Sequence, residues 1–97
     1  MRLETVSMTQ HINITISGKV QGVFFRAATK EKADELGVKG FVCNEPTGNV
    51  YIEAEALQEV LNEFVKWCAS GPPRAQVHHV EVVPGEVSIF VNFEIKR

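Results

Sequence analysis

The sequence predicts an α+β fold in which two helices cover one face of a mainly antiparallel sheet. Three segments, residues 11–17, 50–55 and 88–95, alternate apolar and polar residues, which is the period of a strand with one buried face. Two further segments, residues 26–36 and 57–68, repeat their apolar residues at helical spacing. The resulting order is strand, helix, strand, strand, helix, strand, with a short extra strand at the end. Because strand–helix–strand crossovers are right-handed, this order predicts the split βαβ, or ferredoxin-like, arrangement.

The first strand is predicted over residues 11–17. Its isoleucines occupy every second position and its polar residues point to the opposite face: Ile12, Ile14 and Ile16 against His11, Asn13, Thr15 and Ser17. Residues 1–10 lack the continuous apolar stretch of a secretory signal, and they are predicted to form a mobile N-terminal arm. A single domain is therefore expected over residues 11–97.

The first helix is predicted over residues 26–36, with Gly37 as the residue that ends it. A strand follows over residues 38–45, in which Gly40 indicates either a weak point or a close approach of the backbone. A turn of Pro, Thr, Gly and Asn connects it to the strand over residues 50–55. The two strands are therefore expected to form a hairpin.

The second helix is predicted over residues 57–68, and the Ser-Gly-Pro-Pro sequence that follows ends it. A strand rich in β-branched residues is predicted over residues 77–83. The chain is then expected to turn at residues 84–86 before the final strand over residues 88–95. Four apolar residues share one face of this final strand: Ile89, Val91, Phe93 and Ile95.

Composition is that of an ordinary globular protein, with 44% hydrophobic and 23% charged residues. The apolar runs are much shorter than the ~20 residues that a membrane span needs, so no membrane partner is expected. A net charge of −2 with scattered basic residues argues against a nucleic-acid partner, which would bind a basic face. Cys43 and Cys68 are predicted to be buried free thiols in a cytoplasmic protein, with a disulfide between them as the less favoured alternative. A monomer is the default state.

The segment from Gly18 to Arg26 predicts an anion-binding loop between the first strand and the first helix. Its sequence is Gly-Lys-Val-Gln-Gly-Val-Phe-Phe-Arg, and the two glycines let the backbone turn tightly. Backbone N–H groups in such a turn, beside a helix N-terminus, form a concave anion site. The Arg26 guanidinium is a planar fork of donors that fits two phosphate oxygens. A plain turn is the alternative, because the loop is neither a P-loop nor a dinucleotide-binding glycine motif.

The same nine residues resemble the acylphosphatase signature, G-x-V-Q-G-V-x-F-R, at every fixed position. Residues 40–44, Gly-Phe-Val-Cys-Asn, resemble the second motif of that family, G-aromatic-V-x-N. Residues 71–75, Gly-Pro-Pro-Arg-Ala, are similar to the family's segment before the fourth strand. The resemblance extends over residues 11–95. Three positions depart from the usual pattern without removing a proposed functional group: Phe41, Cys43 and Thr47.

The resemblance implies an enzyme that hydrolyses acyl phosphates to a carboxylate and inorganic phosphate, without a metal or another cofactor. Arg26 would hold the phosphoryl oxygens together with the backbone amides of five residues: Gln21, Gly22, Val23, Phe24 and Phe25. Asn44 would hold the attacking water through its side-chain amide, which both donates and accepts hydrogen bonds. The small-molecule partners would be an acyl phosphate and inorganic phosphate or a similar anion.

Two other functions stay open from the sequence alone. One is a non-catalytic module of the same fold that binds an anion or another ligand and needs only the loop. The other, less favoured, is an RNA-binding sheet that stacks bases on Phe24 and Phe25. These two residues lie in the loop and not on strands, and at least one of them is expected to pack beneath it. Asn44 by itself is typical of a turn, but its place beside the complete first motif favours the enzyme.

Three further groups are predicted to be structural. His78 and His79 are adjacent on a strand, so their side chains point to opposite faces and do not readily share a metal. Glu53 and Glu55 share a strand face that is expected to be solvated. Trp67 is expected to pack at the edge of the second helix.

Overall fold

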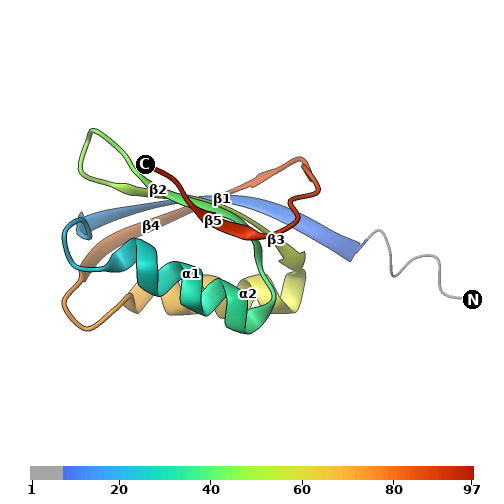
Figure 1. Ribbon diagram of the computed structural model, residues 1–97, viewed down its shortest axis with the longest axis horizontal. Helices are drawn as coiled ribbons and strands as arrows, with labels where there is room; N and C mark the ends of the chain where they lie inside the picture. Colours follow the sequence, from blue (N-terminus) through green and yellow to red (C-terminus); the bar gives the residue numbers. More distant parts are fainter. Residues whose placement is uncertain (1–7) are drawn as a thin grey trace, which may run out of the picture.

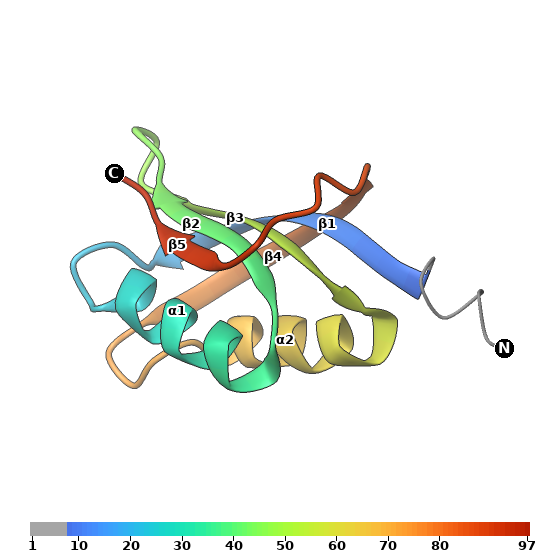
Figure 2. The same cartoon turned by 45° about the vertical axis from the view of Figure 1, so that its right-hand side comes forward.

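The computed structural model describes residues 8–97 (Figure 1). Its elements are, in chain order, β1 (Thr9–Lys19), α1 (Phe25–Leu36), β2 (Lys39–Asn44), β3 (Val50–Leu57), α2 (Gln58–Ser70), β4 (Gln76–Gly85) and β5 (Phe93–Ile95). The strands form one sheet in the order β4-β1-β3-β2-β5; β5 pairs with β2 in parallel and the other pairs are antiparallel. Both helices lie on the same face of this sheet (Figure 2). The predicted ferredoxin-like fold is confirmed.

The core lies between the helices and the sheet face that they cover. Alternate residues of β1 and β3 are buried there, as their period-two patterns predict: Ile12, Ile14, Ile16, Val50, Ile52 and Ala54. Each helix adds three buried residues at helical spacing, Phe25, Thr29 and Ala33 from α1 and Leu61, Phe64 and Cys68 from α2. Burying a large apolar side chain stabilises a fold by about 1.5–3 kcal/mol, so this layer fixes the helices on the sheet. Within residues 8–97, no helix is long and apolar enough to cross a membrane.

Strand β1 begins earlier than the apolar pattern indicates. Thr9 and Gln10 pair with Leu57 and Ala56 at the end of β3. Backbone pairing does not depend on the alternation of side chains, so the ladder extends toward the N-terminus beyond Ile12, the first buried isoleucine. These two residues belong to the sheet, and the part of the predicted arm at residues 1–7 lies outside the described residues.

The hairpin of β2 and β3 forms as predicted, with Asn44 opposite Val50 in its last pair. Gly40 is a point of close backbone approach. It has a φ of 142°, and a Cβ atom at this position would overlap the backbone carbonyl of Glu53 on β3. A side chain at position 40 would therefore push β2 away from β3.

Strand β4 runs on to Gly85, so the turn predicted at residues 84–86 is wrong. Pro84 lies within the ladder, opposite Ile12 of β1. Proline is tolerated here because β4 is an edge strand, where a residue without an N–H group need not break the ladder.

The last strand is much shorter than predicted, because only β5 pairs with β2 and residues 88–92 form no strand. Ile89 has a left-handed φ of 61° and is 80% exposed. The backbone N–H groups of Ser88 and Phe90 donate to the carboxylate of Glu55, the second of them at 3.0 Å. These N–H groups are bonded to a side chain, so they are not available to a neighbouring strand.

The expected solvated face is wrong for Glu55, which is only 3% exposed. The C-terminal segment covers this part of the outer sheet face, where the Phe90 ring stacks on His11 with 6.0 Å between ring centroids. The Nδ1 of His11 lies 2.6 Å from Oε2 of Glu55, and its Nε2 lies 2.8 Å from Oδ1 of Asn13. The alternating pattern identifies the face of Glu55 but not the distant segment that buries it.

Burial alone would raise the pKa of Glu55 and lower that of His11. Hydrogen bonds from His11, Ser88 and Phe90 outweigh burial and lower the pKa of the Glu55 carboxyl below its ordinary value of 4.5. At His11, hydrogen bonds to Glu55 and Asn13 likewise outweigh the effect of burial and raise the pKa of the imidazole above 6.5. Folding therefore favours the charged form of both partners.

We expect this pair to stabilise the fold in full only between about pH 4.5 and pH 6.5. A group whose pKa is raised by folding stabilises the fold fully below its unfolded pKa, and this stabilisation is lost as pH rises through its folded pKa. A group whose pKa is lowered by folding stabilises the fold fully above its unfolded pKa, and this stabilisation is lost as pH falls through its folded pKa. The free energy of unfolding should therefore fall as pH rises above 6.5 through the raised pKa of His11. This fall should be smaller in the Glu55→Gln variant.

At pH 6, urea denaturation should show that Glu55→Gln lowers the free energy of unfolding by about 3 kcal/mol, the cost of breaking a buried pair. Glu94→Gln removes an exposed carboxylate of β5 and should change it by less than about 0.5 kcal/mol. Equal pH dependence in the wild-type protein and in Glu55→Gln would contradict the assignment.

Candidate active site

The loop after β1 starts just beyond a close approach of this strand to β4. The register between the two strands shifts between Ser17 and Gly18. Gly18 has a φ of 129°, and a Cβ atom there would overlap the backbone carbonyl of Gln76. Glycine is required at this position, and the chain leaves the sheet just beyond it to enter the loop.

Helix α1 begins at Phe25 without a capping side chain. The N-cap residue is Phe24, whose φ of 64° is left-handed, and Gly22 before it is left-handed as well, with a φ of 74°. Helices usually have Ser, Thr, Asp or Asn at the N-cap, where the side chain accepts a hydrogen bond from the first free N–H groups. Here the N-cap side chain accepts none, and the first turn of α1 carries no acidic residue. The free N–H groups and the positive end of the helix dipole are therefore available to an external anion.

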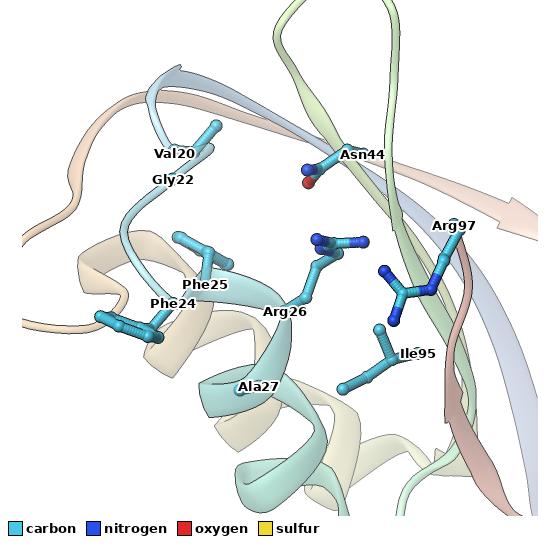
Figure 3. A pocket seen from close by; sticks show the side chains of 9 residues that line it. All are labelled: Val20, Gly22, Phe24, Phe25, Arg26, Ala27, Asn44, Ile95 and Arg97. Atoms are coloured by element: carbon cyan, nitrogen blue, oxygen red, sulfur yellow. The ribbon is translucent and has the colours of Figure 1, made fainter.

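A cavity of about 380 Å³ opens at this helix N-terminus (Figure 3). Arg26 in the first turn of α1 and Asn44 at the end of β2 both line it. The remaining lining residues are Val20, Gly22, Phe24, Phe25, Ala27, Ile95 and Arg97. Figure 3 shows the Arg26 side chain extending from the helix toward the space below Asn44. Both residues reach this cavity because α1 begins, and β2 ends, at the same end of the sheet.

All charged side chains that line the cavity are cationic. Arg26 and Arg97 each bring a guanidinium group, and no Asp or Glu is among the lining residues. Within residues 8–97, no carboxylate lies within 4.0 Å of either guanidinium. Nη1 of Arg26 donates to the backbone oxygen of Lys96 at a long distance of 3.4 Å, and within residues 8–97 its other donors have no hydrogen-bond partner. The cavity therefore suits a small anion with several oxygen acceptors, such as a phosphoryl group.

Residues 12–95 match the family model described as acylphosphatase. The chain belongs to the acylphosphatase family. An acylphosphatase from Rubrobacter xylanophilus is 45% identical over 80 residues, covering 82% of this chain and 73% of the relative. One from Archaeoglobus fulgidus is 45% identical over 84 residues, covering 87% and 94%. The structure of an acylphosphatase from Coxiella burnetii superposes with a TM-score of 0.90 at 34% identity, covering 94% of this chain and 96% of that one.

As a member of the acylphosphatase family, the protein is a hydrolase that acts on acyl phosphates. The function that the two sequence motifs implied is thereby confirmed. Membership also decides for the enzyme over the non-catalytic binding module that the anion loop alone left open.

The loop residues predicted to hold the phosphate fall into two groups in this acylphosphatase. Three of them line the cavity beside Arg26: Gly22, Phe24 and Phe25. Gln21 and Val23 do not line it, and Val23 is buried. Phe25 is also buried beneath the loop, against the edge of the Trp67 ring at 5.8 Å between centroids, so one of the two phenylalanines packs as expected.

Gln21 connects the loop to the β2–β3 turn. Its Nε2 donates to the backbone oxygens of Glu45 at 2.8 Å and Asn49 at 2.9 Å. These two acceptors lie on either side of the turn that follows Asn44. The Gln21 side chain therefore fixes the anion loop relative to the strand that carries Asn44.

Arg97 and Ile95 line the cavity but were missed by the sequence analysis. They belong to the C-terminal segment, which reaches the site because β5 pairs in parallel with β2. The backbone N–H of Lys96 continues this pairing by donating to Val42 at 2.8 Å. The basic end of the chain is visible in the sequence, but its position is not defined until this pairing is known.

Neither cysteine is a candidate nucleophile. Cys68 is buried as predicted, and burial raises the pKa of its thiol to about 12. Cys43 is only half-buried, and burial raises the pKa of its thiol as well. Both are free thiols, whereas a reactive cysteine needs a thiolate of lowered pKa. Among residues 8–97, no group of three or more His, Cys, Asp or Glu side chains is arranged to hold a metal ion.

We expect Gln21→Ala to lower both stability and catalytic efficiency. Two half-buried hydrogen bonds are lost, at about 1 kcal/mol each, and the loop is freed from the hairpin. Thermal unfolding should show the stability loss, and kcat/KM for acetyl phosphate should fall by roughly tenfold, since positioning of the reacting groups is impaired. Gln58→Ala, which removes an exposed glutamine bonded to Asn62 on α2, is the control and should change neither. Wild-type efficiency in Gln21→Ala would show that the loop does not depend on this contact.

Proposed function

We propose that acyl phosphates are hydrolysed in the cavity at the N-terminus of α1, on a phosphoryl group held by Arg26 and the backbone amides of the loop over residues 21–25, of which Gly22, Phe24 and Phe25 line the cavity. The attacking water is held by Asn44. The observation that most supports this proposal is that Arg26 and Asn44 line one cavity at an uncapped helix N-terminus. The cationic lining fits a substrate whose phosphoryl group is an anion.

Charge stabilisation is the first part of the proposed mechanism. Negative charge spreads over the three equatorial oxygens of the phosphoryl group as it is transferred. The guanidinium of Arg26 binds two of these oxygens at once. The loop amides and the N–H groups at the helix N-terminus donate to the phosphoryl oxygens from fixed directions. These donors are in place before the reaction begins, so little reorganisation is needed in the transition state.

Positioning of the water is the second part. The amide of Asn44 has both a donor and an acceptor, so it orients a water while leaving a lone pair directed at phosphorus. The water oxygen bonds to phosphorus as the bond from phosphorus to the acyl oxygen breaks, and the carboxylate leaves with the electron pair. One proton of the water stays on the new phosphate and the other passes to a phosphoryl oxygen. A carboxylate is stable without protonation, so no general acid is required. No general base is required either, because the phosphoryl oxygen accepts the proton of the water.

The proposal assigns no step to a metal or another cofactor, because Arg26 and the helix N-terminus already supply positive charge to the phosphoryl oxygens. Inorganic phosphate is the product and is expected to bind the same site as an inhibitor. The proposed enzyme is a monomer of the cytoplasm. The cytoplasmic location is supported by the free thiols of Cys43 and Cys68, which are typical of a reducing compartment.

Arg26→Ala should lower kcat/KM for acetyl phosphate by roughly 10²–10³-fold, the usual cost of removing one donor to the developing charge. Arg26→Lys should restore little of this loss, since an ammonium group does not reproduce the two-pronged contact. Phosphate release is measured with a chelator present, which also tests the metal-free mechanism. Arg74→Ala, at an exposed arginine outside the cavity, is the control. Full activity of Arg26→Ala would overturn the mechanism.

Asn44→Ala should abolish most turnover while the inhibition constant of inorganic phosphate stays within about threefold of wild type, because the phosphate donors are intact. Because turnover of this variant is too low for an inhibition assay, its affinity for phosphate is measured by calorimetry. Asn62→Ala on the exposed face of α2 controls for the loss of an asparagine. A collapse of phosphate affinity in Asn44→Ala would show that Asn44 binds the anion and does not position the water.

A further inference from the structure

Phe24 is an unusual residue at the rim of a phosphate site. Its ring is 74% exposed, although aromatic side chains stabilise a protein most when they are buried. Its φ of 64° is a strained conformation for a bulky residue, one that Gly or Asn adopts more easily. Strain of this kind is concentrated at functional sites, which raises the question of what the ring contacts.

Phe24 is one of five apolar residues that line the cavity; the others are Val20, Phe25, Ala27 and Ile95. Three of them, Phe24, Ala27 and Ile95, form an apolar edge. In the view of Figure 3, these three side chains lie on one side of the Arg26 guanidinium and Asn44 lies on the other. Phe24 and Ile95 flank Arg26 from opposite directions in this view.

The geometry of phosphoryl transfer relates these two sides. The attacking and leaving oxygens lie roughly in line through phosphorus. If the water is held at Asn44 and the phosphoryl group at Arg26, the acyl group departs on the side away from Asn44. In the view of Figure 3, Phe24, Ala27 and Ile95 lie on that side of Arg26, so an acyl group that leaves in this direction would meet the apolar edge that they form.

We propose that Phe24 is a specificity-determining residue that contacts the acyl group and makes the enzyme prefer aromatic or bulky apolar acyl phosphates over acetyl phosphate. This inference rests on the proposed positions of the phosphoryl group and the water. An exposed ring offers a flat apolar face, and contact with a substrate ring removes apolar surface of both from water. An acetyl group is too small to cover that face.

Ile89 provides a matched control for Phe24. It is also a large apolar residue, is 80% exposed and has a left-handed φ of 61°. It lines no part of the cavity at Arg26. Substituting both residues with Asn keeps a side chain that tolerates this backbone conformation, so the two variants differ mainly in their distance from the site.

The test compares kcat/KM for benzoyl phosphate and acetyl phosphate in the wild-type protein and in three variants, Phe24→Asn, Phe24→Tyr and Ile89→Asn. The readout is the ratio of the two efficiencies, because intrinsic reactivity differences between the substrates cancel when this ratio is compared across variants. Phe24→Asn should lower the ratio about three- to tenfold, the range of one aromatic contact. Phe24→Tyr keeps the ring and should retain the wild-type ratio, as should Ile89→Asn.

An unchanged ratio in Phe24→Asn would overturn the inference, even if both efficiencies fell together, since that result would assign Phe24 to the loop and not to the acyl group. An equal fall of the ratio in Ile89→Asn would also overturn it. Failure of the proposed function is distinguishable, because it appears as full acetyl phosphate turnover in Arg26→Ala and not as a change of this ratio.

Discussion

Close contact between backbones at two glycines determines how the two halves of the site meet. Gly18 lies against the carbonyl of Gln76 on β4, and Gly40 lies against the carbonyl of Glu53 on β3, with no room for a Cβ atom at either position. The first contact sets the place where β1 gives way to the anion loop. The second keeps β2 in register along β3, so that this strand ends with Asn44 opposite Val50. A shift of either strand would separate the loop from Asn44. The shape of the cavity depends on the distance between the loop and Asn44.

The site is built on polar groups that the fold leaves without partners. Most helices satisfy their first N–H groups with a capping side chain, which typically stabilises by about 1 kcal/mol. Helix α1 has an exposed phenylalanine at that position and no acidic residue in its first turn. The fold gives up this stabilisation, and an anion that binds there recovers it. Under the proposed function, stability and catalysis therefore make opposite demands on the same few backbone amides.

The outer face of the sheet contributes to the site at a distance. Glu55 and His11 form a buried pair that binds the backbone of Ser88 and Phe90. This contact holds the segment before β5, and β5 in turn carries Ile95 and Arg97 to the cavity. A charged pair at one end of the sheet thus helps to determine which side chains line the cavity at the other end. The two regions are connected through the pairing of β5 with β2 and through Phe41, whose ring contacts Phe90 and lies under the Lys96 ammonium group.

Local patterns in the sequence determined the elements and the two residues proposed to act in the site. Alternating isoleucines defined β1, helical spacing defined α1 and α2, and two motifs singled out Arg26 and Asn44, because each of these signals depends on neighbours within a few residues. The tertiary structure alone decided the burial of Glu55, the shortening of the last strand and the arrival of Arg97 at the cavity. These features depend on contacts between segments more than 30 residues apart, whose free energy has no counterpart in local periodicity. An alternating strand pattern is the same whether its outer face meets water or a distant part of the chain, so the sequence could not distinguish the two.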